Sequence, residues 1–561
     1  MRPDNWKAPL RPADQMMRLA RMGSFHQSRL SFMRSLLRRM KSEGWRFDVK
    51  LFEINDAGVG RAVYCAIGPK HTYSLVAFAH DLPDDQRSDR VIAQAWDTTF
   101  TLFDGVPTEA DLQRLAQNVP LQEAGRISNT ELSLSRANRS TRLWGHVVGH
   151  LAKGQQPDAE FVNSIGYLMR TTAVYGNGKF GAADRATYHD RPLLDGPFRA
   201  ELLSVYLTRA FVMDLAEHAA RVKGGDTATK LAPDLRRQFG IGNSTGLGMA
   251  PFLTFHPALL NNWIAAREQA LSRVRSVKTA NAAEQATFAN FLKRATQNAN
   301  DWQSQHPLQI DKIAALRADL SALTGHLAST DLSTEYPWDA LMVWAETTLS
   351  AEGQEQLVSL LLEPYPDLVD DLADCMKADE AAHFAIEGTK TVAECLDCIS
   401  ENYAWALGQD YTSPENSARF WYVSEEKLEP RLGERYEDDG ATLEQPHAIA
   451  RDIAAYHQTL LQWPPDALLA DVLIQHPEHR QVARRAQLTQ KLPYAEIRDN
   501  QISADMLPID MLRCKLSFFG ATKFDPRSDR WVRICMYQNA PFPDELANAP
   551  SDDWAYPSLN Q

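Results

Sequence analysis

The run from Gly240 to Ala266 contains no Asp, Glu, Lys or Arg, although charged residues make up 23% of the chain. Charged side chains dominate protein surfaces, so an uncharged run of this length is expected to lie inside the protein. Pro251 and Pro257 make it a poor membrane-spanning helix. We therefore expect this run in the interior of a globular protein and expect no membrane partner.

The first part of this run is rich in glycine and in small polar side chains. Glycine lets the backbone approach a ligand closely, and consecutive free amides bind anions. We expect residues 240–248 to form a loop that cradles the anionic group of a substrate; the alternative is a tight structural turn. It is not a P-loop, because Met249 stands where a P-loop has lysine. The predicted substrate-binding residues of this loop are Gly242, Asn243, Ser244, Thr245 and Gly246.

Three side chains with suitable chemistry lie in or near glycine-rich segments and are candidate catalytic groups. His256 titrates near neutral pH and can act as an acid or a base. Tyr175 and Lys179 flank the glycines around Asn177, and a desolvated lysine is a base or a nucleophile. We predict Asn177 as a substrate-binding residue. The alternative for this second segment is a surface turn.

A third candidate segment combines aromatic residues with a dense mixture of carboxylates and guanidinium groups at 420–435. Glu425 is a candidate general acid or base, because burial or a neighbouring charge shifts the pKa of a carboxyl group. Arg431 is a candidate for binding a substrate carboxylate through two hydrogen bonds. The alternative is a solvated network of ion pairs.

Metal-ligand spacings occur in the sequence, but none is complete. Glu380 and His383 have the spacing found in di-iron carboxylate bundles, yet a matching second pair is not evident. No motif identifies an organic cofactor, so the cofactor is unknown at this stage. Other candidate spacings are those of His146 with His150 and of Asp214 with Glu217 and His218.

The net charge of −13 argues against a nucleic-acid partner, because binding to phosphates needs a basic surface. The charge is uneven: residues 1–50 contain twelve Lys and Arg against four Asp and Glu. This asymmetry predicts that the N-terminal segment docks on an acidic surface of its own chain or of a second subunit, and the latter would give a homodimer. The alternative is a basic arm that touches a membrane or RNA.

The hydrophobic patterns predict an α+β fold. Short runs rich in β-branched and aromatic residues between 45 and 105 indicate an antiparallel sheet. Residues 13–43 predict a helix with Arg34, Arg38 and Lys41 on its polar side and Gly23-Ser24 as the candidate interruption. Helical periodicity dominates from 106 to 505: residues 201–221 are apolar nearly all round and predict a buried helix, and residues 366–386 predict another helix. Runs at 512–519 and 530–537 flank a turn and predict a C-terminal hairpin that completes the N-terminal sheet. The predicted regions are a basic amphipathic helical arm at 1–44, the sheet at 45–105, a mainly helical body with the site at 106–505, and the hairpin with an extended tail at 506–561.

These patterns favour an enzyme of small-molecule metabolism whose substrate carries a carboxylate or a phosphate. General acid and base chemistry of a lyase, isomerase or hydrolase fits better than redox chemistry, because no redox-cofactor motif is present. Six scattered cysteines and the lack of a signal peptide favour the cytoplasm. The alternatives are a metal-dependent (iron or manganese) oxygenase or oxidase built on Glu380 and His383, and a non-catalytic helical interaction protein.

Overall fold

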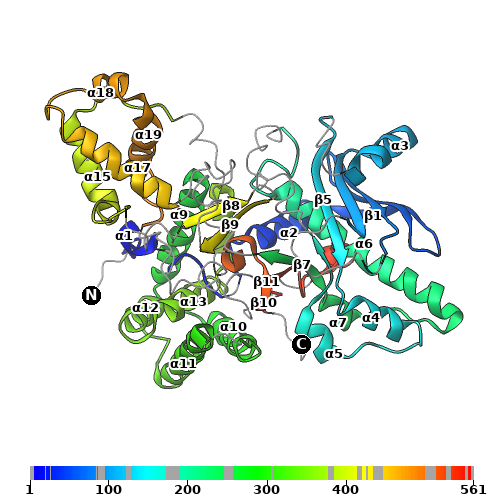
Figure 1. Ribbon diagram of the computed structural model, residues 1–561. Coiled ribbons are helices and arrows are strands. Elements are labelled where there is room, and N and C mark those ends of the chain that lie inside the picture. Colours follow the sequence, from blue (N-terminus) through cyan, green and yellow to red (C-terminus); the bar gives the residue numbers. More distant parts are fainter. Residues whose placement is uncertain are drawn as a thin grey trace.

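The computed structural model places most of the chain (Figure 1). It describes all residues except 1–5, 19–20, 26, 84, 86–94, 122–127, 172–189, 246–256, 305–306, 377–383, 413–419, 425–426, 434–445, 499–512, 514, 526–531, 550–551, 553 and 557–561. For 244–245, 308–309, 420–424, 427–433, 446–448, 515, 523–525 and 532–533 it describes the backbone alone.

Nine of the described strands form one sheet in the order β1-β2-β3-β4-β5-β6-β7-β11-β10. Neighbouring strands are antiparallel except β6 and β7, which are parallel. The strands are β1 (Arg46–Ile54), β2 (Gly60–Ile67), β3 (Thr72–Ala79), β4 (Thr98–Asp104), β5 (Glu131–Arg139), β6 (Tyr167–Thr171), β7 (Gly240–Thr245), β10 (Thr522–Asp525) and β11 (Val532–Met536). The C-terminal hairpin thus extends the N-terminal sheet, as the sequence predicted.

Both faces of the sheet are covered, because side chains alternate between them along each strand. Tyr64 and Leu75 face the main core, which includes the long helix α6 (Arg199–Gly224). Their sequence neighbours Val63 and Val76 face the opposite side, in a smaller cluster with α3 (Glu109–Asn118). Apolar side chains surround most of α6, and this helix is largely buried, as predicted.

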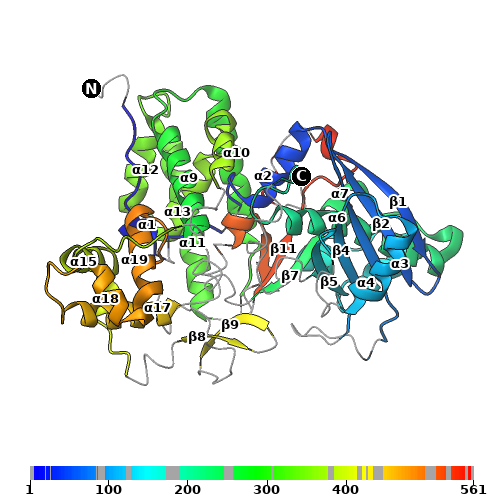
Figure 2. The ribbon, with the colours of Figure 1, turned by 90° about the horizontal axis from the view of Figure 1, so that it is seen from above.

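A bundle of helices packs beside the sheet (Figure 2). Its members are α9 (Pro257–Arg275), α10 (Ala282–Asn300), α11 (Pro307–Ser329), α12 (Pro337–Thr348), α13 (Ala351–Leu361) and the short α14 (Pro366–Val369). One core cluster runs from the sheet into this bundle. The predicted α+β fold with a large helical body is therefore confirmed. The predicted helix over 366–386 is wrong in its length, because a 3-10 segment, Asp370–Met376, follows α14.

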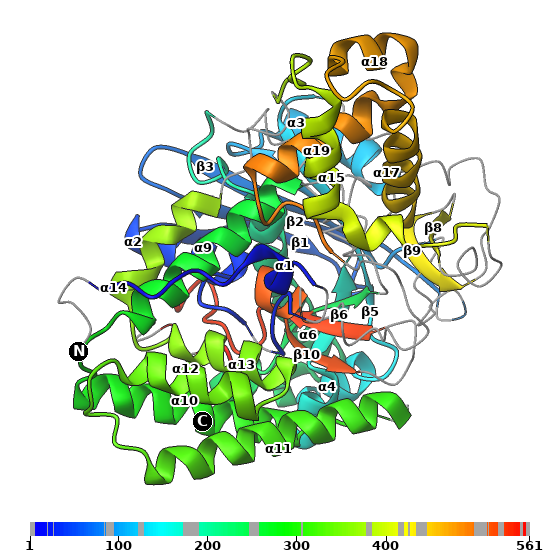
Figure 3. The same ribbon diagram turned by 90° about the vertical axis from the view of Figure 1, so that its left-hand side faces the viewer.

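A smaller helical lobe has a core of its own (Figure 3). It consists of α15 (Val392–Leu407), α17 (Pro446–Leu460), α18 (Leu469–Gln475) and α19 (Arg480–Lys491). Cys395 and Cys398 are buried in this core, consistent with a packing role. The remaining elements are α1 (Ala13–Met16), α2 (Phe32–Ser42), α4 (Trp144–Leu151), α5 (Ala159–Ile165), α7 (Pro233–Arg237), β8 (Phe420–Ser424) and β9 (Lys427–Gly433).

Several element predictions need correction. The helix expected over 13–43 is interrupted around Gly23-Ser24, as predicted, but over a longer stretch: α1 and α2 are separated by a bent segment that contains Gly23 at φ 96°. The first strand of the C-terminal hairpin is Thr522–Asp525, whereas Lys515–Phe519 forms a turn of π-helix. Strands β5, β6 and β7 lie in the region predicted to be helical.

The basic N-terminal segment docks on the acidic helical body through buried ion pairs. Arg11 bridges Glu268 and Glu355, each at 2.7 Å. Arg29 binds Asp370 through two hydrogen bonds of 2.7 Å. The charge asymmetry is thus neutralised within the chain, which is one of the two arrangements that the sequence predicted. The homodimer stays a prediction.

No helix in the described part of the chain combines the length and the apolar character that crossing a membrane requires.

Candidate functional site

The first half of the expected anion-binding loop is a β-strand. Gly240–Thr245 forms β7, which lies between β6 and β11, with Gly242 opposite Cys535. Peptide groups within a central strand pair with the neighbouring strands, so they are not free to cradle an anion. The prediction of a loop is therefore wrong for 240–245, and Gly246 lies outside the described residues.

The glycines of β7 are explained by packing. A Cβ atom on Gly242 would lie 2.6 Å from the ring of Tyr167, and one on Gly240 would lie 2.3 Å from the carbonyl oxygen of Met536. Neither glycine has a positive φ. The missing side chains therefore make room for a ring from β6 and for the backbone at the end of β11. Sequence alone does not distinguish this from room for a ligand.

Asn243 is the one predicted binding residue on β7 whose side chain the structure describes. It is buried, and its Nδ2 donates a hydrogen bond of 3.3 Å to the carbonyl of Thr171. Its Oδ1 accepts no hydrogen bond. Ser244 and Thr245 are described by their backbone alone and pair with β11.

The other predicted site residues are not tested. Arg431 lies on β9 opposite Tyr422, and the structure describes only its backbone. Whether these residues converge on one cavity stays a prediction. The predicted residues that lie outside the described part of the chain are Tyr175, Asn177, Lys179, His256, Glu380, His383 and Glu425.

The remaining metal candidates on α6 have other partners. Asp214 accepts a hydrogen bond of 2.5 Å from the hydroxyl of Tyr64. Glu217 accepts one from the amide of Leu231, and His218 contacts the carbonyl of Asn55 at 3.0 Å. Three residues that are neighbours in sequence thus make three separate contacts.

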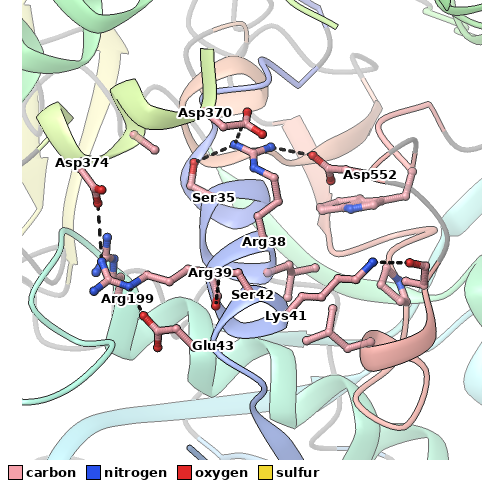
Figure 4. Close-up of a pocket in the computed structure, with 16 residues that line it drawn as sticks. Ser35, Arg38, Arg39, Lys41, Ser42, Glu43, Arg199, Asp370, Asp374 and Asp552 are labelled. Carbon is pink, nitrogen blue, oxygen red and sulfur yellow. Dashed lines mark hydrogen bonds and ion pairs between the residues drawn. The ribbon is translucent and has the colours of Figure 1, made fainter. Parts of the chain in front are cut away.

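The described residues form a polar cleft of about 1080 Å³ (Figure 4). Its floor is the polar face of α2, where Ser35, Arg38, Arg39 and Ser42 recur at helical spacing. One wall is the 3-10 segment after α14, and the other is the C-terminal stretch. The remaining lining residues are Leu37, Lys41, Glu43, Arg199, Asp370, Ala373, Asp374, Pro541, Leu546, Ala549, Asp552 and Trp554.

Arg38 connects the two walls of the cleft. Its guanidinium lies 2.6 Å from Asp552 on one wall and 3.5 Å from Asp370 on the other (Figure 4). Burial and the nearby charges of Arg29 and Arg34 together lower the pKa of Arg38 more than these two carboxylates raise it. Because an arginine pKa starts above 12, the group remains a cation at neutral pH and acts as a fixed structural bridge.

Arg39 and Lys41 are more exposed than Arg38. Arg39 on α2 pairs at 2.7 Å with Glu43, the residue that follows this helix. Its guanidinium also lies 3.7 Å from the carboxylates of Asp195 and Asp374. The ammonium of Lys41, which is exposed, contacts the backbone carbonyl of Ala549. Arg39 is 30% exposed against 18% for Arg38, and Lys41 is exposed, so these two cations are the groups that a ligand could reach.

The cleft contains charges of both signs in equal number. Its lining cations are Arg38, Arg39, Lys41 and Arg199, and its lining carboxylates are Glu43, Asp370, Asp374 and Asp552. Such a lining suits a small polar molecule that carries an anionic group and hydrogen-bond donors. Among the described residues that line it, Glu43 and Asp374 are the carboxylates that are not bound to Arg38.

Sequence reasoning missed this cleft. The helical pattern indicated that Arg34, Arg38 and Lys41 share the polar side of a helix, but Arg34 is fully buried. The spacing of Ser35, Arg38 and Ser42 was the available signal for the cleft floor. It gave no information on the walls, which come from residues more than 300 positions away.

Comparisons with protein-family models, with curated proteins and with solved structures found no match. The function is therefore argued from the residues of this chain.

Proposed function

We propose that this protein binds a small molecule with a carboxylate or phosphate group in the cleft above α2, as an enzyme of small-molecule metabolism would hold its substrate. The observation that carries the proposal is the position of Arg39 and Lys41. Both line the cleft, and Lys41 contacts a neutral carbonyl oxygen in place of a carboxylate. An anion that entered the cleft would gain two charge-assisted contacts.

Arg39 is well placed to exchange partners. Its contacts with Asp195 and Asp374 are 3.7 Å long, and Asp374 is 74% exposed. Exposed ion pairs contribute little free energy, about 0–1 kcal/mol. A ligand carboxylate or phosphate would therefore displace these carboxylates at small cost while Arg38 keeps the walls in place.

In this cleft, Glu43 or Asp374 would perform the acid and base chemistry that the sequence predicts. Both are carboxylates beside Arg39, and a substrate anion bound by that arginine would lie within their reach. The class of reaction, lyase, isomerase or hydrolase, remains part of the proposal.

The test is ligand binding by the whole chain at constant ionic strength. Binding is measured by isothermal titration calorimetry and by thermal unfolding. The probes are inorganic phosphate and citrate. We expect at least one probe to bind with a submillimolar Kd and to raise the Tm. Arg39→Gln with Lys41→Gln should weaken binding about tenfold or more, because a hydrogen bond to a charged group contributes about 1.5–3 kcal/mol.

The matched control is Arg61→Gln. Arg61 is 25% exposed against 30% for Arg39, and it also pairs with carboxylates, those of Glu53 and Glu109. We expect this variant to bind the probe with unchanged affinity. Equal losses in both variants would reduce the effect to general electrostatics, and full binding by the Arg39 and Lys41 variant would refute the cleft as the site.

A further inference from the structure

The corner between α18 and α19 brings two histidines and a glutamate together. Helix α18 ends at Gln475, and the 3-10 turn Pro477–His479 leads directly into α19. The amide of His479 donates to the carbonyl of His476 at 3.2 Å, which closes this turn. Side chains three residues apart eclipse in a 3-10 turn, so His476 and His479 project from the same side.

The three side chains lie at a spacing that a single ion can bridge after small rotations. One potential ligand atom from each of His476, Glu478 and His479 lies within 4.8 Å of the other two. The Nδ1 atom of His476 is 3.3 Å from Oε1 of Glu478, and the two imidazole rings are 6.0 Å apart between centroids. Within the part of the chain that the structure describes, this is the one group of three His, Cys, Asp or Glu residues that meets this spacing.

The hydrogen bonds of Thr459 affect which nitrogen of His479 is free. The hydroxyl oxygen of Thr459 lies 3.2 Å from the carbonyl oxygen of Ala455 and 2.9 Å from Nε2 of His479, and its single proton can be donated to either atom. When the proton goes to Ala455, Nε2 of His479 carries the ring proton and donates it to Thr459, and an ion bound at Nδ1 requires this tautomer. In the neutral ring the lone pair is then on Nδ1, in a residue that is only 7% exposed.

This arrangement is the one that a metal-binding histidine needs. Histidine ligands to metals usually donate their second ring N–H to a neighbouring oxygen, which fixes the tautomer and the ring orientation. Thr459 on α17 provides that oxygen before any ion is bound. The side chains of His476 and Glu478 are 36% and 60% exposed, so they can adjust around an ion that is bound to the more buried His479.

We propose that His476, Glu478 and His479 form a site for a divalent transition metal, with Zn²⁺ as the ion that best fits two imidazoles and one carboxylate. Zinc bonds to histidine nitrogen are about 2.0–2.1 Å long, which small rotations of the two exposed side chains can reach. The fourth position is open to solvent. A bound ion would fasten the corner between α18 and α19 to α17 through the His479–Thr459 hydrogen bond. The site lies in the small lobe, outside the cleft residues.

The experiment uses the full-length protein after treatment with EDTA and dialysis, titrated with ZnCl₂ at pH 7 in a calorimeter. We expect one Zn²⁺ per chain with a Kd in the micromolar range or below, and a rise in Tm. His476→Ala removes an exposed side chain that the core does not need, so loss of binding there reports on the site and not on folding. We expect at least a hundredfold weaker binding in this variant and in His479→Ala.

Thr459→Val tests the positioning role of the hydroxyl. It keeps the shape of the side chain, and loss of such a supporting hydrogen bond typically weakens metal binding 10- to 100-fold. X-ray absorption at the zinc edge, with two imidazole ligands expected, identifies the donors independently of affinity. Unchanged binding in Thr459→Val together with full loss in His476→Ala would remove the tautomer argument and overturn the proposal in this form.

The matched control is His71→Ala. His71 is 34% exposed and contacts the carboxylate of Asp104, much as His476 contacts Glu478. We expect it to bind zinc as the unmodified protein does. If zinc binds equally well to His476→Ala and His479→Ala, the ion is held elsewhere, with Glu380 and His383 as the first alternative, and the proposed site is wrong. Absence of any zinc binding would overturn it as well.

Discussion

The guanidinium of Arg34 binds the carboxylate of Glu363 through two hydrogen bonds of 2.6 and 2.8 Å, and neither side chain is exposed to solvent. Arg34 lies on α2, and Glu363 follows α13. The same guanidinium contacts Asp552 near the C-terminus at 3.2 Å. One buried cation therefore joins the N-terminal segment, the helical body and the C-terminal segment, and it shares Asp552 with Arg38, which lies one helical turn further along α2.

Replacing Arg34 should destabilise the fold strongly. Arg34→Met keeps a long apolar stem but leaves Glu363 buried, with Arg29 at 3.6 Å as its nearest remaining cation. Removing one partner of a buried ion pair typically costs about 3–5 kcal/mol. We expect a loss of this size in the free energy of unfolding, measured by urea denaturation followed by circular dichroism.

The control is an ion pair of the same type at the surface. Arg273 binds Asp371 at 2.7 Å, with exposures of 41% and 59%. Arg273→Met should change the free energy of unfolding by about 1 kcal/mol or less. The double variant Arg34→Met with Glu363→Met should regain much of the lost stability, because no unpaired charge then stays buried. A small effect of Arg34→Met alone would show that the pair does not fasten α2.

Docking of the N-terminal segment should depend on pH in the acid range. Burial by itself raises the pKa of Glu355, but the charges of Arg11 and Arg267 outweigh burial and hold that pKa below its ordinary value. In the same way, the arginines around Asp552 hold its pKa below the usual range despite burial. A carboxyl group with a lowered pKa stabilises the folded chain above its unfolded pKa, about 4, and this contribution is lost as the pH falls through the folded value.

Hydrogen exchange measured by mass spectrometry between pH 7 and pH 3 tests this prediction. After correction for the intrinsic rate, we expect protection of residues 6–42 to be constant at pH 5–7 and to fall below about pH 4. Strands β2 and β3 serve as the internal reference, because their protection rests on backbone pairing. Equal loss of protection in both regions would indicate global unfolding, and unchanged protection of 6–42 at pH 3 would contradict the assigned role of the carboxylates.

The strands that sequence could predict are those whose own residues favour strands. β2 and β3 are rich in β-branched and aromatic residues that alternate between two apolar faces, so local preference and burial agree. β7 has the sequence Gly-Ile-Gly-Asn-Ser-Thr, which reads as a loop, and its strand conformation depends on pairing with β6 and β11. Such tertiary pairing leaves no local pattern.

The cleft was beyond prediction for a related reason. The sign of the N-terminal charge predicted that this segment meets an acidic surface, and Arg11 and Arg29 do so. The positions of Asp370 and Asp552 decide which arginines form ion pairs in that docking and which remain open to a ligand. Those positions are set by packing across more than 300 residues, so only the structure separates Arg34 from Arg39.

The glycines of β7 provide a prediction that separates packing from ligand binding. In Gly242→Ala the new Cβ would lie 2.6 Å from the ring of Tyr167, and overpacking of this kind costs about 1–3 kcal/mol. We expect thermal and urea unfolding to show that loss, and we expect Tyr167→Leu in the same chain to restore part of it by making room. The control is Gly325→Ala on α11, where the new methyl group meets no atom within 4 Å. Alanine is a better helix former than glycine by about 1 kcal/mol, so this variant should be slightly more stable than the unmodified protein. If Gly242→Ala were as stable as the unmodified protein yet lost ligand binding, the glycine would serve a ligand after all, and the packing explanation of β7 would be wrong.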